Sequence, residues 1–120
     1  MEKVNLDAAF DTFDEHGAPR LAAELNGQAV KLAKLEGEFV WHHHDDADEM
    51  FLVTSGELRI KLREEDDVVL EEGEFLVVPR GVEHKPVSEE ETEILLFEPA
   101  GTTNTGNVES ELTKTDLERV

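Results

Sequence analysis

Two short segments, far apart in the chain, carry most of its recognisable chemistry. The first, residues 41–49, has the sequence WHHHDDADE and lies between Gly37 and Gly56. The second is marked by four residues at short intervals: Gly73, Pro79, Gly81 and His84. Imidazole nitrogens and carboxylate oxygens are common ligands of divalent metals. A chain with this pattern has to fold so that the following side chains meet around one ion: His42, His44, Glu49 and His84.

The histidines of the first segment alternate along an expected strand, Glu38–His44. Side chains of a strand point to opposite faces in turn, so His42 and His44 share one face and His43 occupies the other. Two imidazoles about 7 Å apart on one face can converge on a single ion. His43 is therefore expected to lie outside the ligand set.

Turns are expected to bring the other two ligands to the same point. Residues 45–48 are short and polar, which suits a turn that lets Glu49 open the neighbouring strand. A second tight turn at residues 79–81, Pro-Arg-Gly, can aim His84 at the histidines. The chain has no cysteine, so disulfides and thiolate ligands are excluded. A nitrogen and oxygen set of this kind suits one zinc, iron, nickel, cobalt, copper or manganese ion per chain.

Most of the remaining sequence consists of short segments with strand patterns. Asn26-Gly27 joins Arg20–Leu25 to Gln28–Leu35, and this dipeptide favours a hairpin because both turn residues adopt positive φ. Later strands are predicted, with a turn at residues 88–91, at Met50–Thr54, Leu58–Arg63, Val68–Leu70, Glu74–Val78, His84–Val87 and Glu93–Glu98. Core positions are predicted at Phe75, Leu76, Val77, Val78 and Ile94–Phe97. Many short strands with regular turns predict an all-β sandwich or barrel.

The two ends of the chain differ from this pattern. Leu6, Phe10 and Phe13 have helical spacing, which predicts one or two helical turns across a barrel end. A chain of 120 residues has room for one domain, with the barrel at about 20–100 and a polar tail at 101–120. Within the tail, residues 109–120 are expected to form a short helix or to be disordered.

The net charge of −19 limits the partners of this protein. An acidic surface repels nucleic acid and anionic lipid. The 21 glutamates against six lysines favour a halophilic adaptation, and the alternative is ordinary acidity for solubility. The sequence shows neither a secretory signal pattern nor a run of about 20 apolar residues that could span a bilayer. A cytoplasmic protein is therefore expected.

Both segments resemble the sequence motifs of the cupin superfamily. Its first motif is similar to the series Gly37, His42, His44, Glu49 and Gly56, although one residue is missing after Gly37. Its second motif is similar to the series Gly73, Pro79, Gly81 and His84, and Ser88 replaces the usual final asparagine. The resemblance spans roughly residues 28–98. It implies a double-stranded β-helix, or jelly-roll barrel, with His42, His44, Glu49 and His84 as metal ligands.

The chain looks most like small single-domain cupins of the mannose-6-phosphate isomerase-like group. Residues 98–106, EPAGTTNTG, resemble the C-terminal loop of that group. The likeness concerns fold and motif and implies no reaction. A phosphosugar would require cationic residues near the metal, and the motifs supply only Arg80 and Lys85. Phosphosugars are therefore disfavoured.

The leading functional hypothesis is a metal-dependent enzyme, a dioxygenase, isomerase or lyase, that acts on a small oxygenated metabolite. The alternative is a cupin that binds a small ligand without catalysis, as a sensor or store. Lys31 is expected to be an exposed strand residue, with a pocket cation as the alternative, and the sequence leaves open whether Asn104 reaches the pocket. Trp41, Met50 and Leu52 on the opposite strand face favour a homodimer.

Overall fold

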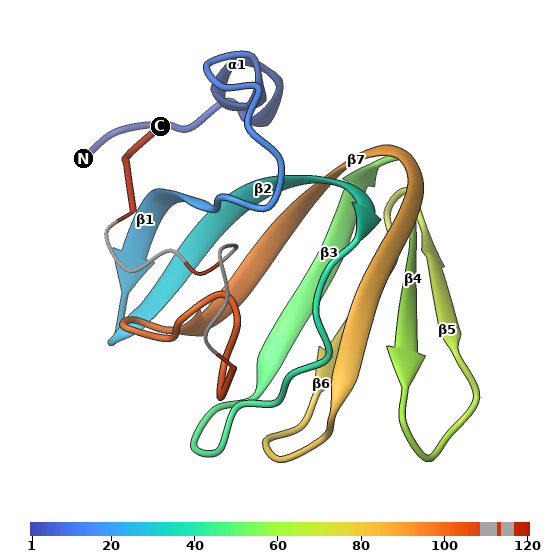
Figure 1. Ribbon diagram of the computed structural model, residues 1–120. Helices are drawn as coiled ribbons and strands as arrows, with labels where there is room; N and C mark the ends of the chain where they lie inside the picture. Colours follow the sequence, from blue (N-terminus) through green and yellow to red (C-terminus); the bar gives the residue numbers. More distant parts are fainter. Residues whose placement is uncertain (109–112, 114–116) are drawn as a thin grey trace.

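The computed structural model describes residues 1–108, 113 and 117–120, and within them the chain is almost entirely β (Figure 1). One short helix precedes seven strands: α1 Leu6–Phe10, β1 Arg20–Leu25, β2 Gln28–Glu38, β3 Glu49–Ser55, β4 Glu57–Leu62, β5 Val68–Glu71, β6 Phe75–Val78 and β7 His84–Pro99. The predicted N-terminal helical segment and the Asn26-Gly27 hairpin are both confirmed.

All strand pairs are antiparallel, and β7 organises them into a barrel. The sheet order is β1-β2-β7-β3-β6, and β7 also pairs with β4, which pairs with β5. Figure 1 shows β7 curving from the β4–β5 hairpin to the strands β2 and β3. The first half of β7 therefore closes one side of the barrel, and its second half forms the centre of the other side.

The predicted turn at residues 88–91 is wrong, because β7 continues through it. Two hydroxyl groups hold the strand at this bend. The Ser88 Oγ lies 2.7 Å from the Thr92 Oγ1, which donates to the Glu57 carbonyl at 2.9 Å. Thr92 also packs against Gly56, where an added Cβ would lie 2.8 Å from the Thr92 Oγ1. The charged side chains at 89–91 face solvent while the backbone stays extended.

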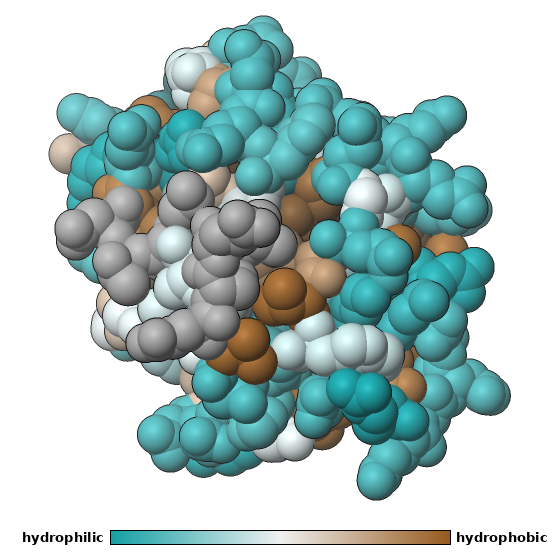
Figure 2. Space-filling model, in the orientation of Figure 1, coloured by the Kyte–Doolittle hydropathy of each residue, from teal (hydrophilic) through white to brown (hydrophobic). Residues whose placement is uncertain are grey.

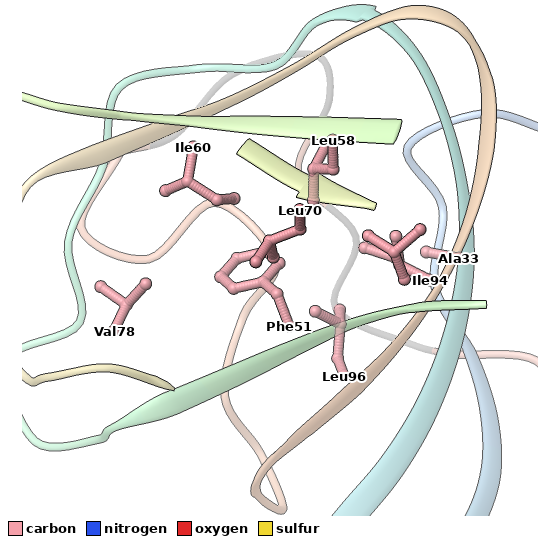
Figure 3. Close-up of a cluster of buried hydrophobic side chains, with 9 residues drawn as sticks. Ala33, Phe51, Leu58, Ile60, Leu70, Val78, Ile94 and Leu96 are labelled. Atoms are coloured by element: carbon pink, nitrogen blue, oxygen red, sulfur yellow. The ribbon is translucent and has the colours of Figure 1, made fainter. Parts of the chain in front are cut away.

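The barrel encloses one apolar cluster, drawn in Figure 3. Its buried members come from six strands: Ala33, Phe51, Val53, Leu58, Ile60, Leu70, Val78, Ile94 and Leu96. Strand β6 contributes only one of its two faces to this cluster. The predicted core positions Phe75 and Val77 are wrong, because these side chains point outward and are 62% and 48% exposed. Val78 and Ile94 are buried as predicted.

A second apolar cluster lies outside the barrel, where α1 covers β2. Phe10 and Phe13 pack against Leu32 on the outer face of that strand. The Asn5 side chain caps the helix by accepting a hydrogen bond from the Ala8 N–H at 3.0 Å. The Lys34 Nζ donates to the Phe13 carbonyl at 2.7 Å, which ties the end of this segment to the barrel.

The surface seen in Figure 2 is mostly hydrophilic, in keeping with the net charge of −19. Among the described residues, no helix combines the length and the apolar character needed to cross a membrane. Near the C-terminus, the Glu118 carbonyl accepts from the Leu21 N–H at 2.8 Å, so the described residues 117–120 pair with β1. Residues 109–112 and 114–116 of the predicted tail lie outside the described residues.

Candidate metal centre

The four side chains predicted to bind metal lie together inside one end of the barrel. One ligand atom from each of them lies within 4.8 Å of every other, and all four side chains are buried. They come from three places in the chain: His42 and His44 follow β2, Glu49 begins β3, and His84 begins β7. Two long-range strand pairings, β3 with β7 and β2 with β7, bring these places together.

The secondary structure of the segment that carries His42 and His44 differs from the predicted one. The expected strand Glu38–His44 is wrong, because β2 already includes Glu38 and ends there. Beyond it, only His42 makes a β-bridge, in which the His42 N–H donates to the His84 carbonyl at 3.0 Å. The reciprocal bond from the His84 N–H measures 2.9 Å. One exchanged pair of hydrogen bonds thus sets two of the predicted ligands side by side.

Two of the imidazole rings are oriented by the same local device. The Nδ1 of His42 hydrogen-bonds to the Val40 carbonyl at 2.9 Å, and the Nδ1 of His84 to the Val82 carbonyl at 2.8 Å. A backbone carbonyl only accepts, so each Nδ1 carries the proton and each Nε2 keeps a free lone pair. This is the tautomer that a metal-binding histidine needs.

The polar atoms at the centre of the cluster lack ordinary partners. The Nε2 atoms of His44 and His84 lie 3.3 and 3.4 Å from the Glu49 Oε1, without hydrogen-bond geometry. All three atoms are buried, and none has a hydrogen-bond partner in the described part of the chain. Buried polar atoms of this kind are rare because each one costs free energy. A divalent cation would satisfy all three at once, so these residues fit a metal.

The electrostatics of the cluster favour the forms that bind a cation. Burial and the neighbouring His84 lower the pKa of His42 from 6.5 to about 4, which keeps this imidazole neutral at physiological pH. Burial alone would raise the pKa of Glu49. The contacts with His44 and His84 outweigh that effect and hold the pKa of Glu49 below its ordinary value. Neutral imidazoles and an ionised carboxylate are the protonation states required of metal ligands.

The other charged residues of the motif segments point elsewhere. The His43 Nε2 lies 2.9 Å from the Asp45 Oδ1 and does not belong to the cluster. The Asp48 Oδ1 accepts from the Arg80 N–H at 2.9 Å, which joins the two turns next to the site. Lys85 pairs with Glu38 outside the ligand cluster. The charged side chains of these three pairs therefore contact one another and do not belong to the cluster of His42, His44, Glu49 and His84.

A small cavity of about 30 Å³ adjoins the cluster. Two of the clustered side chains, His42 and Glu49, line it together with an otherwise mainly apolar wall: Gly17, Pro19, Ala33, Leu35, Phe39, Phe51, Pro86, Ile94, Leu96 and Asn104. Asn104 thus reaches this pocket, and its Nδ2 donates to the Gly17 carbonyl at 3.1 Å. Lys31 does not line it. The cavity has room for about one or two water-sized groups.

The C-terminal loop supports the segment that carries the histidines. The Asn107 Oδ1 accepts from the His43 N–H at 2.8 Å, and Thr105 is fully buried. At Gly106 an added Cβ would lie only 2.2 Å from the His43 carbonyl oxygen, so this position requires glycine. Part of the predicted polar tail is therefore packed against the site.

Sequence reasoning missed two buried ionisable residues beside the cluster, Lys31 and Glu98, and burial raises the pKa of Glu98 to about 9. Lys31, expected to be exposed, is 4% exposed, and Glu98 is 1% exposed. Strand alternation could have found them, since Lys31 lies between the inward-facing Ala29 and Ala33. The same alternation puts Glu98 on the face of Leu96.

The sequence profile of the cupin domain matches residues 29–98, which include all four clustered side chains. This chain belongs to the cupin family. The uncharacterized protein YdbB of Bacillus subtilis (strain 168) is 38% identical to this cupin over 86 residues, which cover 71% of this chain and 76% of YdbB.

Two solved structures share the fold of this cupin. A cupin-2 domain containing protein from Shewanella frigidimarina NCIMB 400 is 47% identical, with a TM-score of 0.78 over 80% of this chain and 93% of that chain. Protein NMB1881 from Neisseria meningitidis is 28% identical, with a TM-score of 0.76 over 82% of this chain and 100% of that chain. Both likenesses agree with the barrel described above.

Proposed function

We propose that this cupin holds one divalent transition metal per chain on His42, His44, Glu49 and His84, and that it is an enzyme acting on a small oxygenated metabolite. The observation that carries the proposal is the set of buried Nε2 and carboxylate oxygen atoms that face one another without hydrogen-bond partners. A metal bound there would supply Lewis acidity or redox chemistry to an oxygen-bearing substrate.

The residues around the cluster define what such a substrate can be. The cavity wall is mainly apolar and has room for about one or two water-sized groups, so it can take only the small reacting end of a substrate. The apolar part of this wall lies beside His42 and Glu49. Arg80 is exposed and paired with Asp48, so it supplies no charge to the cavity, and a phosphosugar finds no cationic partner in this wall.

The alternative is a cupin that binds a small ligand without converting it. The specific observation in its favour is the composition of the cavity wall, in which Asn104 is the only polar side chain besides His42 and Glu49. An amide neither gives nor takes a proton at neutral pH. Any acid or base chemistry at this cavity therefore depends on the clustered side chains His42 and Glu49.

The test of the metal site is elemental analysis of protein purified without a metal-affinity tag. Wild-type protein should contain about one transition metal per chain. His44→Ala should lose the metal, because it removes a ligand with a buried, unsatisfied Nε2. His43→Ala is the matched control, and it should keep the metal because His43 pairs with Asp45 outside the cluster. Metal retained by His44→Ala, or lost from His43→Ala, would contradict the assignment.

The metal found decides the next assay. Iron would direct the search to dioxygenase substrates, and zinc, nickel or manganese to isomerase and lyase substrates. Turnover by the loaded protein that is absent from His44→Ala would support an enzyme. Ligand binding without turnover would support the sensor or storage alternative.

We also propose a homodimer formed through the outer face of β3 and β6. Met50 and Leu52 are half-buried there, beside the exposed Val77 and Phe75 on the paired strand. Trp41, expected on this face, instead stacks on the Arg63 guanidinium at 4.0 Å from the ring centroid. A two-fold contact is the commonest way to cover such a face. Light scattering that reports a monomer at micromolar concentration would contradict this proposal.

A further inference from the structure

Lys31 and Glu98 are a pair of ionisable side chains in the interior of the barrel. The Lys31 Nζ lies 3.7 Å from the Glu98 Oε1, and both side chains are at least 96% buried. An ion pair in the interior is weak evidence for stability, because desolvation of the two ions offsets much of their attraction. A role linked to their neighbours is therefore the better explanation for a pair placed here.

The strand register puts this pair directly beside the ligand Glu49. Met50 on β3 is paired with Phe97 on β7, so the preceding Glu49 lies across from Glu98. On the other side of β7, Glu98 is paired with Ala29 of β2, and Lys31 lies two residues further along the same inner face. Cross-strand and diagonal neighbours on one face are close enough to interact. The three ionisable side chains thus form one row across three adjacent strands.

In this row the lysine has a hydrogen-bond partner, but each of the two carboxyl groups has one oxygen without a partner among the described residues. The Lys31 Nζ donates to the Thr102 carbonyl at 2.8 Å and attracts the Glu98 Oε1. The Glu98 Oε2 and the Glu49 Oε1 are both buried, and neither has a hydrogen-bond partner among the described residues. The two carboxyl groups are cross-strand neighbours on one face and are close enough to interact, so the position of Glu98 constrains that of Glu49.

We infer that Glu98, anchored by Lys31, is a positioning residue for the ligand Glu49 and strengthens metal binding at the cluster. This inference rests on the metal site proposed above. Neither Lys31 nor Glu98 lines the cavity beside the cluster, so they act through Glu49 and not on the substrate held there. Residues that fix the position of a metal ligand commonly change metal affinity by about 10- to 100-fold when replaced.

Lys31 gives this arrangement a second consequence. Its hydrogen bond to the Thr102 carbonyl connects the start of the C-terminal loop to the row formed by Lys31, Glu98 and Glu49. That loop carries Asn104 to the cavity wall and Asn107 to the His43 backbone. The buried pair therefore connects the position of a metal ligand to the position of the loop that closes the cavity.

The test compares Glu98→Gln with Glu93→Gln. Both substitutions remove one carboxylate from β7, but Glu93 is partly exposed and lies about 17 Å further along the strand, at about 3.3 Å per residue. Cobalt(II) serves as the probe, and its affinity is measured by competition with a chelator. Glu98→Gln should weaken cobalt binding at least about tenfold and shift the visible cobalt spectrum. Glu93→Gln should leave both unchanged.

The melting temperature of the metal-free variants shows whether a loss of cobalt affinity comes from a displaced Glu49 or from a destabilised fold. A Glu98→Gln protein that melts like Glu93→Gln but binds cobalt less tightly supports the inference, and wild-type affinity with an unchanged spectrum overturns it. If Glu98→Gln does not fold, the variant K31M/E98Q removes both members of the pair and leaves no unpaired charge. It should show the same loss of affinity, and wild-type affinity in it would overturn the inference. Failure of the wild-type protein to bind cobalt would instead refute the metal site itself.

Discussion

The interior of this cupin barrel has two unlike halves, and strand β3 passes through both. Its inward-facing side chains are Glu49, Phe51 and Val53. The first belongs to the ligand cluster, and the other two belong to the apolar core. The strand geometry is the same along its length, so only the side chains distinguish the halves.

The halves contribute to stability in opposite ways. A large apolar side chain in the core contributes about 1.5–3 kcal/mol through burial. A buried polar atom without a partner costs about 1–3 kcal/mol, and the ligand end contains four such atoms among the described residues, on His44, Glu49, His84 and Glu98. The apolar half therefore stabilises the fold, while the unpartnered polar atoms of the other half destabilise it.

The largest expected effect comes from the apolar half. Ile60→Ala should lower the free energy of unfolding by about 3 kcal/mol, because it leaves a cavity at a fully buried position. Urea unfolding measures this loss. Val69→Ala, on the paired strand β5 and 39% exposed, is the control and should cost well under 1 kcal/mol. Metal affinity should survive Ile60→Ala in the folded protein, and its loss would show that the two halves are not independent.

A change of pH should act on the polar half. The pKa of His42 is about 4 in the folded protein against 6.5 in the unfolded chain, so the unfolded chain binds more protons between these values. The His42 contribution to the stability of the metal-free protein should therefore fall by up to about 3 kcal/mol as the pH falls from 6.5 to 4. Glu98 opposes this loss above pH 4.5, because burial raises its pKa to about 9 and the folded protein then binds more protons at this carboxyl than the unfolded chain does. The pKa of Glu49 is also depressed, so its contribution is lost in the same direction below pH 4.5.

The control for the pH experiment is Ile60→Ala, which removes no titratable group. Its stability should be lower than that of the wild type at every pH, with the same slope between pH 6.5 and 4. Urea unfolding in the presence of a chelator measures both proteins. In Glu98→Gln, which lacks the opposing titration of Glu98, a stability that stays flat over this interval would show that the ligand end is not electrostatically strained without metal.

The smallest effect is expected from salt, which acts on the surface and reaches neither half of the interior. The carboxylates at 64–67 and 89–91 are exposed and close in sequence, so they repel each other. If the charge of −19 is a halophilic adaptation, the melting temperature should rise with potassium chloride and level off once the Debye length reaches about 3 Å. A gain of about 1 kcal/mol corresponds to a few degrees. A flat or falling melting temperature would leave acidity as a solubility trait.

Much of the fold and the cluster could be predicted because the decisive patterns are local. Alternation and the Asn26-Gly27 dipeptide predicted the all-β class and the first hairpin, and the structure confirms both. The histidines and Glu49 were recognisable because few other residue types bind divalent metals. Their spacing relative to glycine and proline carried the resemblance to cupins, and membership of the family is confirmed. The ligand role of these residues stays a prediction.

Other features depended on contacts between distant strands. Alternation places two residues on the same face but does not say which face is buried, so Phe75 and Val77 were wrongly assigned to the core. Lys31 was wrongly expected to face solvent although it shares a strand face with Ala29 and Ala33, because its partners, Glu98 and the Thr102 carbonyl, are distant in the sequence. A buried charge is tolerated only where partners meet it, and those partners come from another strand and a loop.

The sequence by itself therefore determined which atoms can bind a metal and which class of fold presents them. The tertiary structure decided that β7 runs unbroken from His84 to Glu98, so that one strand carries both a predicted ligand and the carboxylate beside Glu49. It also decided that the row from Lys31 to Glu49 is closed to solvent. The physical reason is that residue type and spacing act locally, whereas burial and electrostatic pairing exist only once distant segments have come together.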